Sequence, residues 1–406
     1  MRILIIGKLF PPAKRARALQ LAKVALALSE SGCEIRVLAG LDANDAKPQW
    51  PFPVHYIRLE EIIENPVHRS ILKRFVISLH NFFRRRGWWR RAVTDALEIV
   101  QEFNPDIILS SSSPYDSHCV ALALQRKTGI PWIAYFSDPW PPLIMPVPYR
   151  ESPKHRGRLK TFWEMHLVRN TLRECAALVM GNSYALELME KETGIAVIKK
   201  GFAIPHIGSE QLDKSLTTNK KLAHIGKLCD CRYSPELLAA VKRVAAEMPD
   251  RFEGLILVGR VCEAFQNLIR REEMEEIVEL AGYLPDVRAK EIASRSHALL
   301  VVEANMKASP FLPSKFADYA MMGQPIIAIT PPTGAIRDYL KKHGGGWAVT
   351  HNTDQIADAI RQAFKNENVG GSKTSIIEES TLSSLFGKKD VAQLYIDMFE
   401  NVLKQR

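Results

Sequence analysis

Short apolar segments alternate with longer amphipathic segments along almost the whole chain. This alternation is typical of βαβ units, in which a helix crosses over between two parallel strands. In the first half, strands are predicted at Arg2–Ile6, Glu34–Ala39, Ile107–Ser110, Trp132–Phe136 and Leu178–Gly181. In the second half, they are predicted at Leu222–Ile225, Gly254–Val258, Val278–Ala281, Ala298–Val302 and Pro325–Ile329. The pattern therefore predicts an α/β protein with doubly wound parallel sheets.

The length of 406 residues suits two such domains better than one. The segment that follows Gly201 is polar and rich in turn-forming residues, which indicates a linker. We expect an N-terminal Rossmann-like domain at 1–203 and a second Rossmann-like domain at 204–385. The amphipathic tail at 386–406 is expected to form a helix that crosses back to the first domain.

Three features bear on the cellular compartment. No apolar run approaches the roughly 20 residues that a membrane-spanning helix needs. The N-terminal Ile/Leu run turns at Gly7, which favours a buried first strand over a signal peptide. Of the six cysteines only Cys229 and Cys231 are close, and their C-x-C spacing has no second half. A zinc site is therefore not expected, and a reduced, cytoplasmic protein is favoured.

The segment HIGKLCDCRYSPELLAAV, from His224 to Val241, has the features of an anion site. A strand ends at Gly226, a polar loop carries Lys227 and Arg232, and a helix begins at Ser234-Pro235, with good residues for a helix start. A helix N-terminus beside two cations favours a phosphate or diphosphate. The alternative is that the two basic residues are solvated on a surface loop.

A second segment, from Ser309 to Pro331, leads from a loop into a short helix that ends at Gly323. Lys315 and Asp318 lie one turn apart on one face of this helix. The lysine could bind a phosphate and the carboxylate a ribose diol. The alternative is a helical Lys–Asp pair without a ligand.

Together these segments resemble glycosyltransferase family 4, a retaining family with the GT-B fold, in which two Rossmann-like domains face each other across a cleft. Gly226-Lys227-Leu228 and Arg232 match the family's G-R-L-x-x-x-K loop, which implies that Lys227 and Arg232 bind the donor's diphosphate. The stretch from Asp318 to Pro325 matches E-A-M-A-C-G-x-P, so the family's ribose-binding glutamate falls on Asp318. AGYLP resembles the segment whose backbone contacts the nucleobase, which places Tyr283 beside the base.

The first half also resembles this family in RILIIGKLFPP, the helix with Arg17, SSSPYDSH and FSDPW. Asp138 and His118 are the candidates for contacting the acceptor or the sugar, and Asp138, at a strand end, is the catalytic candidate of the two. For His118 a local structural role is an equal alternative.

Two departures from the family pattern are evident. Pro310 replaces the first glutamate of the family's E-x7-E motif, which is associated with the donor sugar. The loop after the first strand lacks the usual glycine pair, and Lys14, Arg15 or Arg17 could supply charge there instead.

The resemblance implies transfer of a sugar from a nucleoside diphosphate, with retention of configuration. Charge then develops on the departing β-phosphate and must be stabilised by fixed donors. Many glycosyltransferases use a metal held by D-x-D, and this sequence contains no D-x-D. We therefore predict metal-independent catalysis without a cofactor, in which Lys227, Arg232 and a helix N-terminus stabilise the leaving group. The expected acceptor is a glycan or lipid-linked glycan of bacterial surface polysaccharide or lipopolysaccharide synthesis.

The net charge is +10, and much of it lies between Arg69 and Arg91, a stretch without Asp or Glu. The basic residues there are Arg69, Lys73, Arg74, Arg84, Arg85, Arg86, Arg90 and Arg91. Arg84–Arg86 lie beside Trp88 and Trp89 and follow an apolar helical face. This combination predicts peripheral contact with an anionic membrane, on the inner face. The alternative is a helix packed on its own domain with a solvated basic face.

Other classes of protein are less consistent with the sequence. A sugar-nucleotide epimerase of the same fold would need an acid/base pair that we do not identify. A nicotinamide dehydrogenase should show G-x-G-x-x-G after the first strand, and neither Gly7 nor Gly226 begins one. A nucleic-acid partner is not expected, because the charge is concentrated in one segment rather than spread over a reading element. A non-enzymatic protein that binds anionic surfaces remains an alternative.

Overall fold

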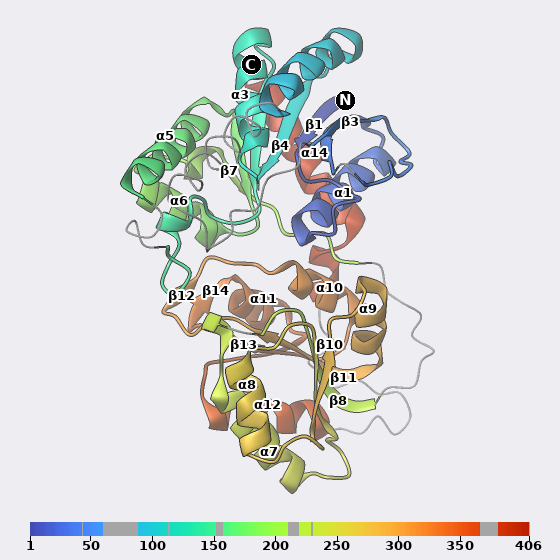
Figure 1. Ribbon diagram of the computed structural model, residues 1–406, viewed down its shortest axis with the longest axis vertical. Coiled ribbons are helices and arrows are strands. Elements are labelled where there is room, and N and C mark those ends of the chain that lie inside the picture. The colour runs from blue at the N-terminus through green and yellow to red at the C-terminus, as the bar shows by residue number, and fades with distance from the viewer. Residues whose placement is uncertain are drawn as a thin grey trace, which may run out of the picture. The chain divides into compact units, whose positions relative to one another are not determined.

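The computed structural model describes residues 1–42, 44–59, 88–112, 114–151, 157–209, 219–228, 230–365 and 381–405. The chain divides into two compact units, each with its own parallel sheet (Figure 1). The first unit comprises Met1–Ile144, Pro153–Ile204 and Lys388–Arg406, and the second comprises Met145–Ser152 and Pro205–Gly387. The short segment Met145–Ser152, which the sequence division left in the first domain, thus packs with the second unit. The predicted class of two doubly wound α/β domains is confirmed.

The first unit contains a seven-stranded sheet with the order β3-β2-β1-β4-β5-β6-β7 and parallel neighbours throughout. Its strands are β1 (Arg2–Gly7), β2 (Glu34–Leu41), β3 (Val54–Arg58), β4 (Ile107–Ser112), β5 (Trp132–Phe136), β6 (Ala177–Met180) and β7 (Gly201–Ala203). The sequence pattern did not predict β3 and β7. Both are short edge strands, which have a neighbour on one side only and therefore carry a weaker apolar signal.

The helices of this unit are α1 (Ala16–Glu30), residues 88–103, α3 (Asp116–Thr128), α5 (Arg158–Glu174), α6 (Ser183–Thr193) and α14 (Lys388–Lys404). The C-terminal helix α14 packs against α1, and Lys388 Nζ lies 2.5 Å from Glu30 Oε1. Its buried face carries Val391, Tyr395 and Phe399, which are at most 1% exposed. Because these residues recur at helical spacing, the amphipathic tail forms a helix with one face in the core.

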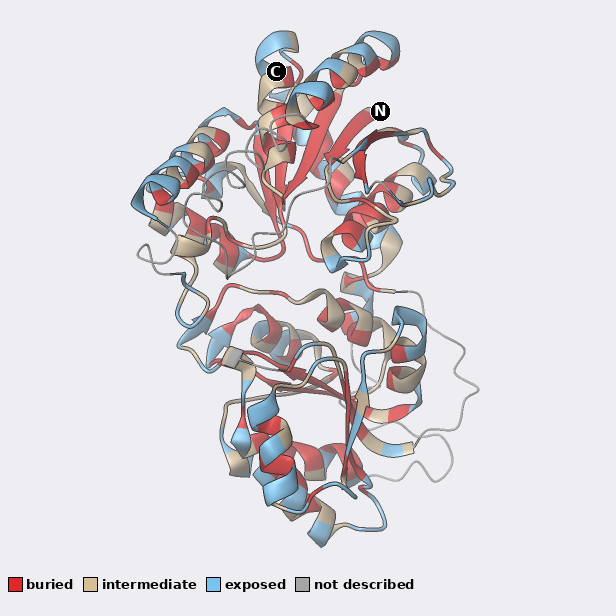
Figure 2. Ribbon diagram, viewed as in Figure 1, coloured by how far each residue is buried: buried red, intermediate tan, exposed pale blue. Residues whose placement is uncertain are grey.

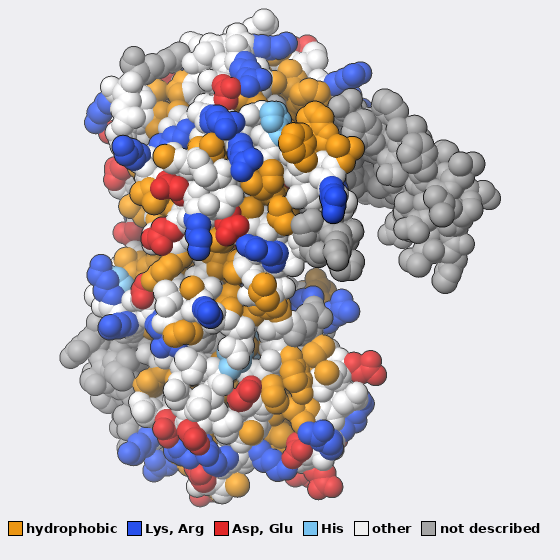
Figure 3. All heavy atoms as spheres, turned by 90° about the vertical axis from the view of Figure 1, so that its left-hand side faces the viewer, with side chains coloured by type: hydrophobic (Ala, Val, Ile, Leu, Met, Phe, Trp, Pro, Cys, Tyr) orange, Lys and Arg blue, Asp and Glu red, His pale blue; other side chains and the backbone are white. Residues whose placement is uncertain are grey.

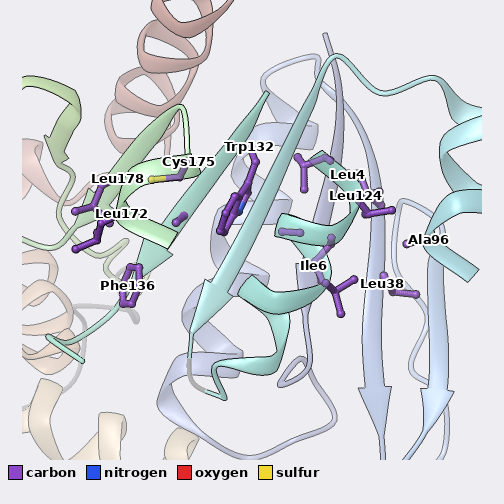
Figure 4. Close-up of a cluster of buried hydrophobic side chains, with 14 of the residues drawn as sticks. Leu4, Ile6, Leu38, Ala96, Leu124, Trp132, Phe136, Leu172, Cys175 and Leu178 are labelled. Carbon is purple, nitrogen blue, oxygen red and sulfur yellow. The ribbon is translucent and has the colours of Figure 1, made fainter. Parts of the chain in front are cut away.

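The core of the first unit forms on one face of the sheet from alternating strand residues (Figure 4). Leu4 and Ile6 of β1 lie beside Leu38 of β2, and Trp132 and Phe136 come from β5. Successive side chains of a strand point to opposite faces, so residues two apart share this core. Fully burying one such side chain stabilises the fold by about 1.5–3 kcal/mol.

Trp88 and Trp89 belong to this core rather than to the surface. Trp88 is 2% exposed and its ring lies under Lys8, with Nζ 5.1 Å from the ring centroid. Trp89 is partly buried and packs against the same cluster. The prediction that these two tryptophans contact a membrane is therefore wrong, because their apolar rings are used to cover the sheet. Arg84, Arg85 and Arg86 lie outside the described residues.

The second unit contains a six-stranded parallel sheet with the order β10-β9-β8-β11-β13-β15. Its strands are β8 (Asn219–Ile225), β9 (Gly254–Val258), β10 (Val278–Gly282), β11 (Ser296–Val302), β13 (Ile326–Ile329) and β15 (Gly346–Val349). A separate two-stranded ribbon joins β12 (Ala308–Ser309) to β14 (Thr333–Gly334). The helices of the second unit are α7 (Pro235–Glu247), α8 (Glu263–Arg271), α9 (Asp286–Arg295), α10 (Ser314–Met322), α11 (Ala335–His343) and α12 (Thr353–Lys365).

The burial pattern matches a sheet covered by helices on both faces. In both units the strands and the inward sides of the helices are buried, whereas the outer helix faces are exposed (Figure 2). The sequence pattern did not predict β15 and α12, although α12 packs against α7 and closes the core of the second unit. Over the described part of the chain, no helix has the length and apolar character needed to cross a membrane.

Candidate functional site

The sheet of the second unit reverses its order between β8 and β11. The chain runs outward from β8 to β9 and β10 on one side, and from β11 to β13 and β15 on the other. In open α/β sheets, ligands bind at the carboxyl ends of the strands beside such a switch point. Here β8 is followed directly by Gly226, and β11 is followed directly by Glu303. The candidate site is built around these two strand ends.

Two glycines let the chain leave β8 and β9 side by side. Gly226 has φ +115° and Gly259 has φ +122°, a region that side chains rarely allow. A Cβ atom on Gly259 would lie 2.5 Å from the Gly226 carbonyl oxygen, so any larger residue would push the two strand ends apart. Beyond this turn Leu228 is fully buried and Lys227 is exposed. The loop is thus anchored on one side of Lys227 and presents the lysine to solvent.

Lys315, in the first turn of α10, reaches the end of β8. Its Nζ donates to the Ile225 carbonyl oxygen at 3.2 Å and lies 3.3 Å from His224 Nε2. The same Nζ would lie 3.7 Å from a Cβ atom on Gly226. The ammonium group is therefore held at the base of the Gly226 loop, and its role as a phosphate ligand stays a prediction.

The hydrogen bonds of His224 define its tautomer. Its Nδ1 lies 2.9 Å from the Leu300 carbonyl oxygen, which can only accept, so Nδ1 carries the proton. Nε2 is then the acceptor for Lys315. Burial lowers the pKa of His224 well below its usual value, and the charge of Lys315 lowers it further. Burial also lowers the pKa of Lys315 well below its usual value, and the Arg232 guanidinium adds to this effect.

Arg232 is oriented by an aromatic residue of the segment Met145–Ser152. Its Nε donates to Tyr149 Oη at 3.3 Å, and the Tyr149 ring packs edge-on against Phe311 with centroids 4.9 Å apart. Burial raises the pKa of Tyr149 to about 12, so the phenol stays neutral at physiological pH. The guanidinium group keeps its positive charge while one of its donors is fixed in place.

A buried carboxylate, Glu303, lies beneath the cations. It is 3% exposed, its Oε1 accepts from Ser309 Oγ at 2.5 Å, and its Oε2 accepts from Thr330 Oγ1. Burial raises the pKa of Glu303, whereas these two hydroxyl groups and the charges of Arg232 and Lys315 oppose that rise. The cluster therefore holds the basic side chains of Arg232 and Lys315 around one carboxylate, and Lys227 lies on the adjoining loop after β8.

A neutral histidine connects the backbone of Glu303 to the start of α7. His351 Nε2 donates to the Glu303 carbonyl oxygen at 2.9 Å, and its Nδ1 lies 3.0 Å from Ser234 Oγ. Burial lowers the pKa of His351. The predicted helix start at Ser234-Pro235 is confirmed, but the serine side chain makes no capping bond to the helix backbone. Its hydroxyl group contacts His351 and Glu236 instead.

Asp318 does not share the environment of Lys315. Its Oδ1 accepts hydrogen bonds from Ser209 N at 2.8 Å and from Ser209 Oγ at 2.7 Å. The neighbouring Gly208 lies so close to α10 that a Cβ atom would be 2.6 Å from the Ala317 carbonyl oxygen. Asp318 therefore ties the segment before residue 210 to α10, a contact that the helical pattern could not reveal.

Tyr283 follows the edge strand β10 and is 84% exposed. It lies on the same strand-end side of the sheet as Gly226, because β10, β9 and β8 are parallel neighbours. No group of three metal-ligating side chains occurs in the described ranges.

In the first unit, Arg17 and Asp138 are brought together. Arg17 Nη2 donates to Asp138 Oδ2 at 2.5 Å, and both side chains are more than one third exposed. Asp138 follows the end of β5, where the sequence placed a ligand-contacting carboxylate. Lys14 and Arg15 are exposed just before α1.

His118 lies in the core of the first unit, at 0% exposure, between Trp132, Phe136 and Tyr115. Trp132 Nε1 donates to Ser110 Oγ, and this hydroxyl group lies 2.7 Å from His118 Nδ1. Nε2 has no hydrogen-bond partner among the described residues. Burial lowers the pKa of His118 to about 3. This position contradicts the prediction of a contact with acceptor or sugar, because the ring reaches no surface.

Four site residues were not predicted from the sequence: His224, Tyr149, Glu303 and His351. Glu303 had a recognisable signal, since it is a single acid that ends the apolar run ALLVV at a strand terminus. The other three had none, because each acts through a residue far away in the sequence.

Residues 19–202 match the family model described as Glycosyltransferase Family 4. No curated protein sequence matches the chain significantly. Sucrose-phosphate synthase from Thermosynechococcus elongatus is similar in structure, with TM-score 0.60, 15% identity, and coverage of 100% of this chain and 97% of that chain.

Two further solved structures are similar over nearly their whole length. The lipopolysaccharide outer core galactosyltransferase WaaB has TM-score 0.58 and 15% identity, with 99% of each chain covered. A putative UDP-N-acetylglucosamine 2-epimerase from Listeria monocytogenes has TM-score 0.57 and 11% identity, with 100% of this chain and 97% of that chain covered. At these identities the similarity concerns the fold. Residues 19–202 are thus identified as a Glycosyltransferase Family 4 domain, and the chain as a whole shares the GT-B fold of solved glycosyltransferases.

Proposed function

We propose that the chain transfers a sugar from a nucleoside-diphosphate donor to a glycan or lipid-linked acceptor, with retention of configuration and without a metal ion. The observation that carries this proposal is the cationic cluster at the ends of β8 and β11. Lys227 follows the glycine turn, Lys315 lies 3.7 Å from where a Gly226 side chain would begin, and the Arg232 charge acts on Lys315. A diphosphate is the ligand that such a cluster at a switch point favours.

In this proposal the cations stabilise the departing phosphate. As the bond between the anomeric carbon and the donor oxygen breaks, negative charge grows on the β-phosphate. Lys227 and Arg232 donate to its oxygens, and the N-terminus of α7 adds the positive end of its dipole. Lys315 donates from the base of the loop. In this proposal Lys227, Arg232 and Lys315 supply the charge that other glycosyltransferases obtain from a metal held by D-x-D, a motif that this sequence lacks.

The remaining predicted contacts belong to the nucleoside and the acceptor. We propose that Tyr283 lies beside the base and that Asp318 contributes to the ribose site through the segment it holds. We also propose that Asp138, Arg17, Lys14 and Arg15 contact the acceptor or the sugar, since they lie at strand and helix ends of the first unit. The similarity of fold to an outer core galactosyltransferase supports lipopolysaccharide or surface polysaccharide synthesis as the pathway.

A peripheral location on the inner face of the cytoplasmic membrane completes the proposal. Its support is the acid-free basic stretch that ends at Arg91. Replacing Arg84, Arg85 and Arg86 with glutamine should reduce sedimentation of the protein with phosphatidylglycerol vesicles at low salt, because each charge near the surface contributes about 1 kcal/mol. Equal sedimentation of variant and wild type would remove this stretch from membrane binding.

The test of the donor site is isothermal titration with uridine, guanosine and thymidine diphosphates in excess EDTA. We expect at least one of them to bind, and we expect Lys227→Ala and Arg232→Ala each to lower kcat by about 10²-fold or more, as loss of a transition-state donor does. Lys221→Ala is a matched control, because Lys221 lies on β8 but pairs with Glu279 at 2.7 Å. Binding that requires a divalent ion would refute the metal-free proposal.

An epimerase is the rival activity, and one structural neighbour is described as such an enzyme. Incubation of the protein with a sugar nucleotide in the absence of acceptor separates the two. Conversion to an epimeric sugar nucleotide would favour the epimerase, whereas slow release of nucleoside diphosphate would favour the transferase.

A further inference from the structure

Helix α5 of the first unit carries apolar residues on two faces. One face packs into the core, where Val168 and Leu172 are 0% exposed. On the other face Leu159 is 73%, Phe162 67% and Trp163 55% exposed. A surface helix of a globular protein normally buries one apolar stripe and presents polar residues on the opposite side. The second apolar face of α5 is therefore not explained by the folding of the unit.

The exposed residues form one continuous surface. Positions 159, 162, 163 and 166 follow the i, i+3, i+4, i+7 spacing of a single helical face. The Trp163 ring lies edge-on to the His166 ring, with centroids 6.0 Å apart. We call Leu159, Phe162 and Trp163 the α5 surface. Of the seven large hydrophobic residues that are more than half exposed in the described ranges, these are three, within five consecutive positions.

The helical turn that begins α5, next to the α5 surface, is basic. Arg158 and Lys160 are exposed in the first turn of the helix. The sequence from Ser152 to Trp163 contains four Lys or Arg residues and no Asp or Glu. The first acid of the helix, Glu164, is only 9% exposed. Figure 3 shows the side of the molecule on which α5 lies, with hydrophobic side chains at the surface beside Lys and Arg side chains.

We propose that the α5 surface inserts into the headgroup region of an anionic lipid bilayer, with Arg158 and Lys160 at the lipid phosphates. Tryptophan and phenylalanine on one helix face, flanked by basic residues, are typical of interfacial membrane contact. Positive charge adds attraction to anionic lipid. The surface is too small to hold a second protein copy alone. Three side chains of at most about 150–250 Å² each, partly exposed, fall short of the roughly 800 Å² per partner of a stable interface.

This contact rests on the proposed peripheral location at the membrane and deepens it, but it does not depend on the transfer reaction. It also replaces the apolar part of the membrane contact that the sequence had assigned to Trp88 and Trp89. Arg158 and Lys160 lie outside the stretch from Arg69 to Arg91, so the two regions can be tested separately.

The first experiment measures the partition of the full-length protein onto vesicles of phosphatidylglycerol and phosphatidylcholine by co-sedimentation at low salt. The partition coefficient of the double variant Phe162→Ser/Trp163→Ser should be lower than that of wild type by about tenfold or more, because two exposed aromatic side chains no longer enter the interface. Val287→Ser is the matched control: Val287 is 63% exposed on α9 of the second unit, and its variant should partition like wild type. Nucleoside diphosphate binding should be equal in all three proteins.

The second experiment tests insertion directly, by quenching of tryptophan fluorescence with brominated phosphatidylglycerol. Wild type should be quenched, whereas Trp163→Phe should partition nearly as well but lose much of the quenching, since the other described tryptophans are less exposed.

Three results would overturn the proposal: no partition of wild type at low salt, equal partition of the double variant, or equal quenching of Trp163→Phe. Loss of self-association in the double variant, with partition unchanged, would assign the surface to a second copy and also overturn it. Because nucleotide binding is measured on the same proteins, failure of the membrane contact is distinguishable from failure of the donor site.

Discussion

The contact between Asp318 and Ser209 separates a structural role of this carboxylate from a ligand-binding role. The family resemblance predicts that Asp318→Ala weakens nucleotide affinity and raises KM, because a ribose contact is equal in ground and transition states. The structure shows that Asp318 Oδ1 already accepts two hydrogen bonds from Ser209, at 2.8 Å and 2.7 Å. We therefore predict that Asp318→Ala also lowers stability, and that Ser209→Ala reproduces part of this loss.

The magnitude follows from the bonds that are lost. Each hydrogen bond to a charged acceptor contributes about 1.5–3 kcal/mol when buried, and less here because Asp318 and Ser209 are partly exposed. Asp318→Ala removes both bonds and should cost about 2–3 kcal/mol, whereas Ser209→Ala removes the hydroxyl bond and should cost about 1 kcal/mol. For a unit of this size, 1 kcal/mol corresponds to a shift of about 2–4 °C in Tm.

The assay is a thermal melt of the full-length protein, with and without a saturating nucleoside diphosphate, on Asp318→Ala, Ser209→Ala and the double variant. The losses should be less than additive in the double variant, because both single changes remove the same contact. Asp338→Ala on α11 is a control for loss of a helical aspartate in the same unit. An unchanged Tm for Asp318→Ala, together with a weaker nucleotide affinity, would refute the structural role. The ribose contact would then be the role that the data support.

Three further predictions concern titrating and orienting groups. Nucleoside diphosphate affinity should fall as pH rises through the lowered pKa of Lys315, since only the ammonium form attracts phosphate; calorimetry in buffers of different ionisation enthalpy should detect proton uptake on binding. His118 has a pKa of about 3 in the fold, so its contribution to stability is complete above the unfolded value of about 6.5 and decreases as pH falls below it. The difference in unfolding free energy between wild type and His118→Phe should change by about 2 kcal/mol between pH 7.5 and pH 5. Denaturant titrations that give the same difference at both pH values would contradict this. Tyr149→Phe should lower kcat by roughly two- to tenfold with little change in KM, because Arg232 loses the hydrogen bond that orients it; steady-state kinetics measures this, and a wild-type kcat would show that Tyr149 does not act on Arg232.

Local patterns in the sequence were sufficient to predict most of the secondary structure. All ten strands predicted from apolar runs correspond to strands of the two sheets, and the amphipathic stretches between them form helices. The parallel, doubly wound class followed from that alternation, because a crossover helix is the usual way to join parallel strands. The edge strands β3, β7 and β15 were missed, since an edge strand is specified by its one neighbour rather than by its own run of apolar residues.

Local patterns along the chain indicate which residues could bind an anion, whereas the surroundings of each residue depend on how distant segments pack. Lys227, Arg232 and Lys315 were recognisable because a glycine turn, a helix start and basic residues occur close together along the chain. Asp318 meets Ser209, a residue 109 positions away, and no local pattern reports that contact. His118 is enclosed by rings from other elements, and so its polarity alone suggested a role that its burial excludes. The physical reason is that burial and hydrogen-bond partners depend on how distant segments pack, whereas turns and helix starts depend on neighbouring residues.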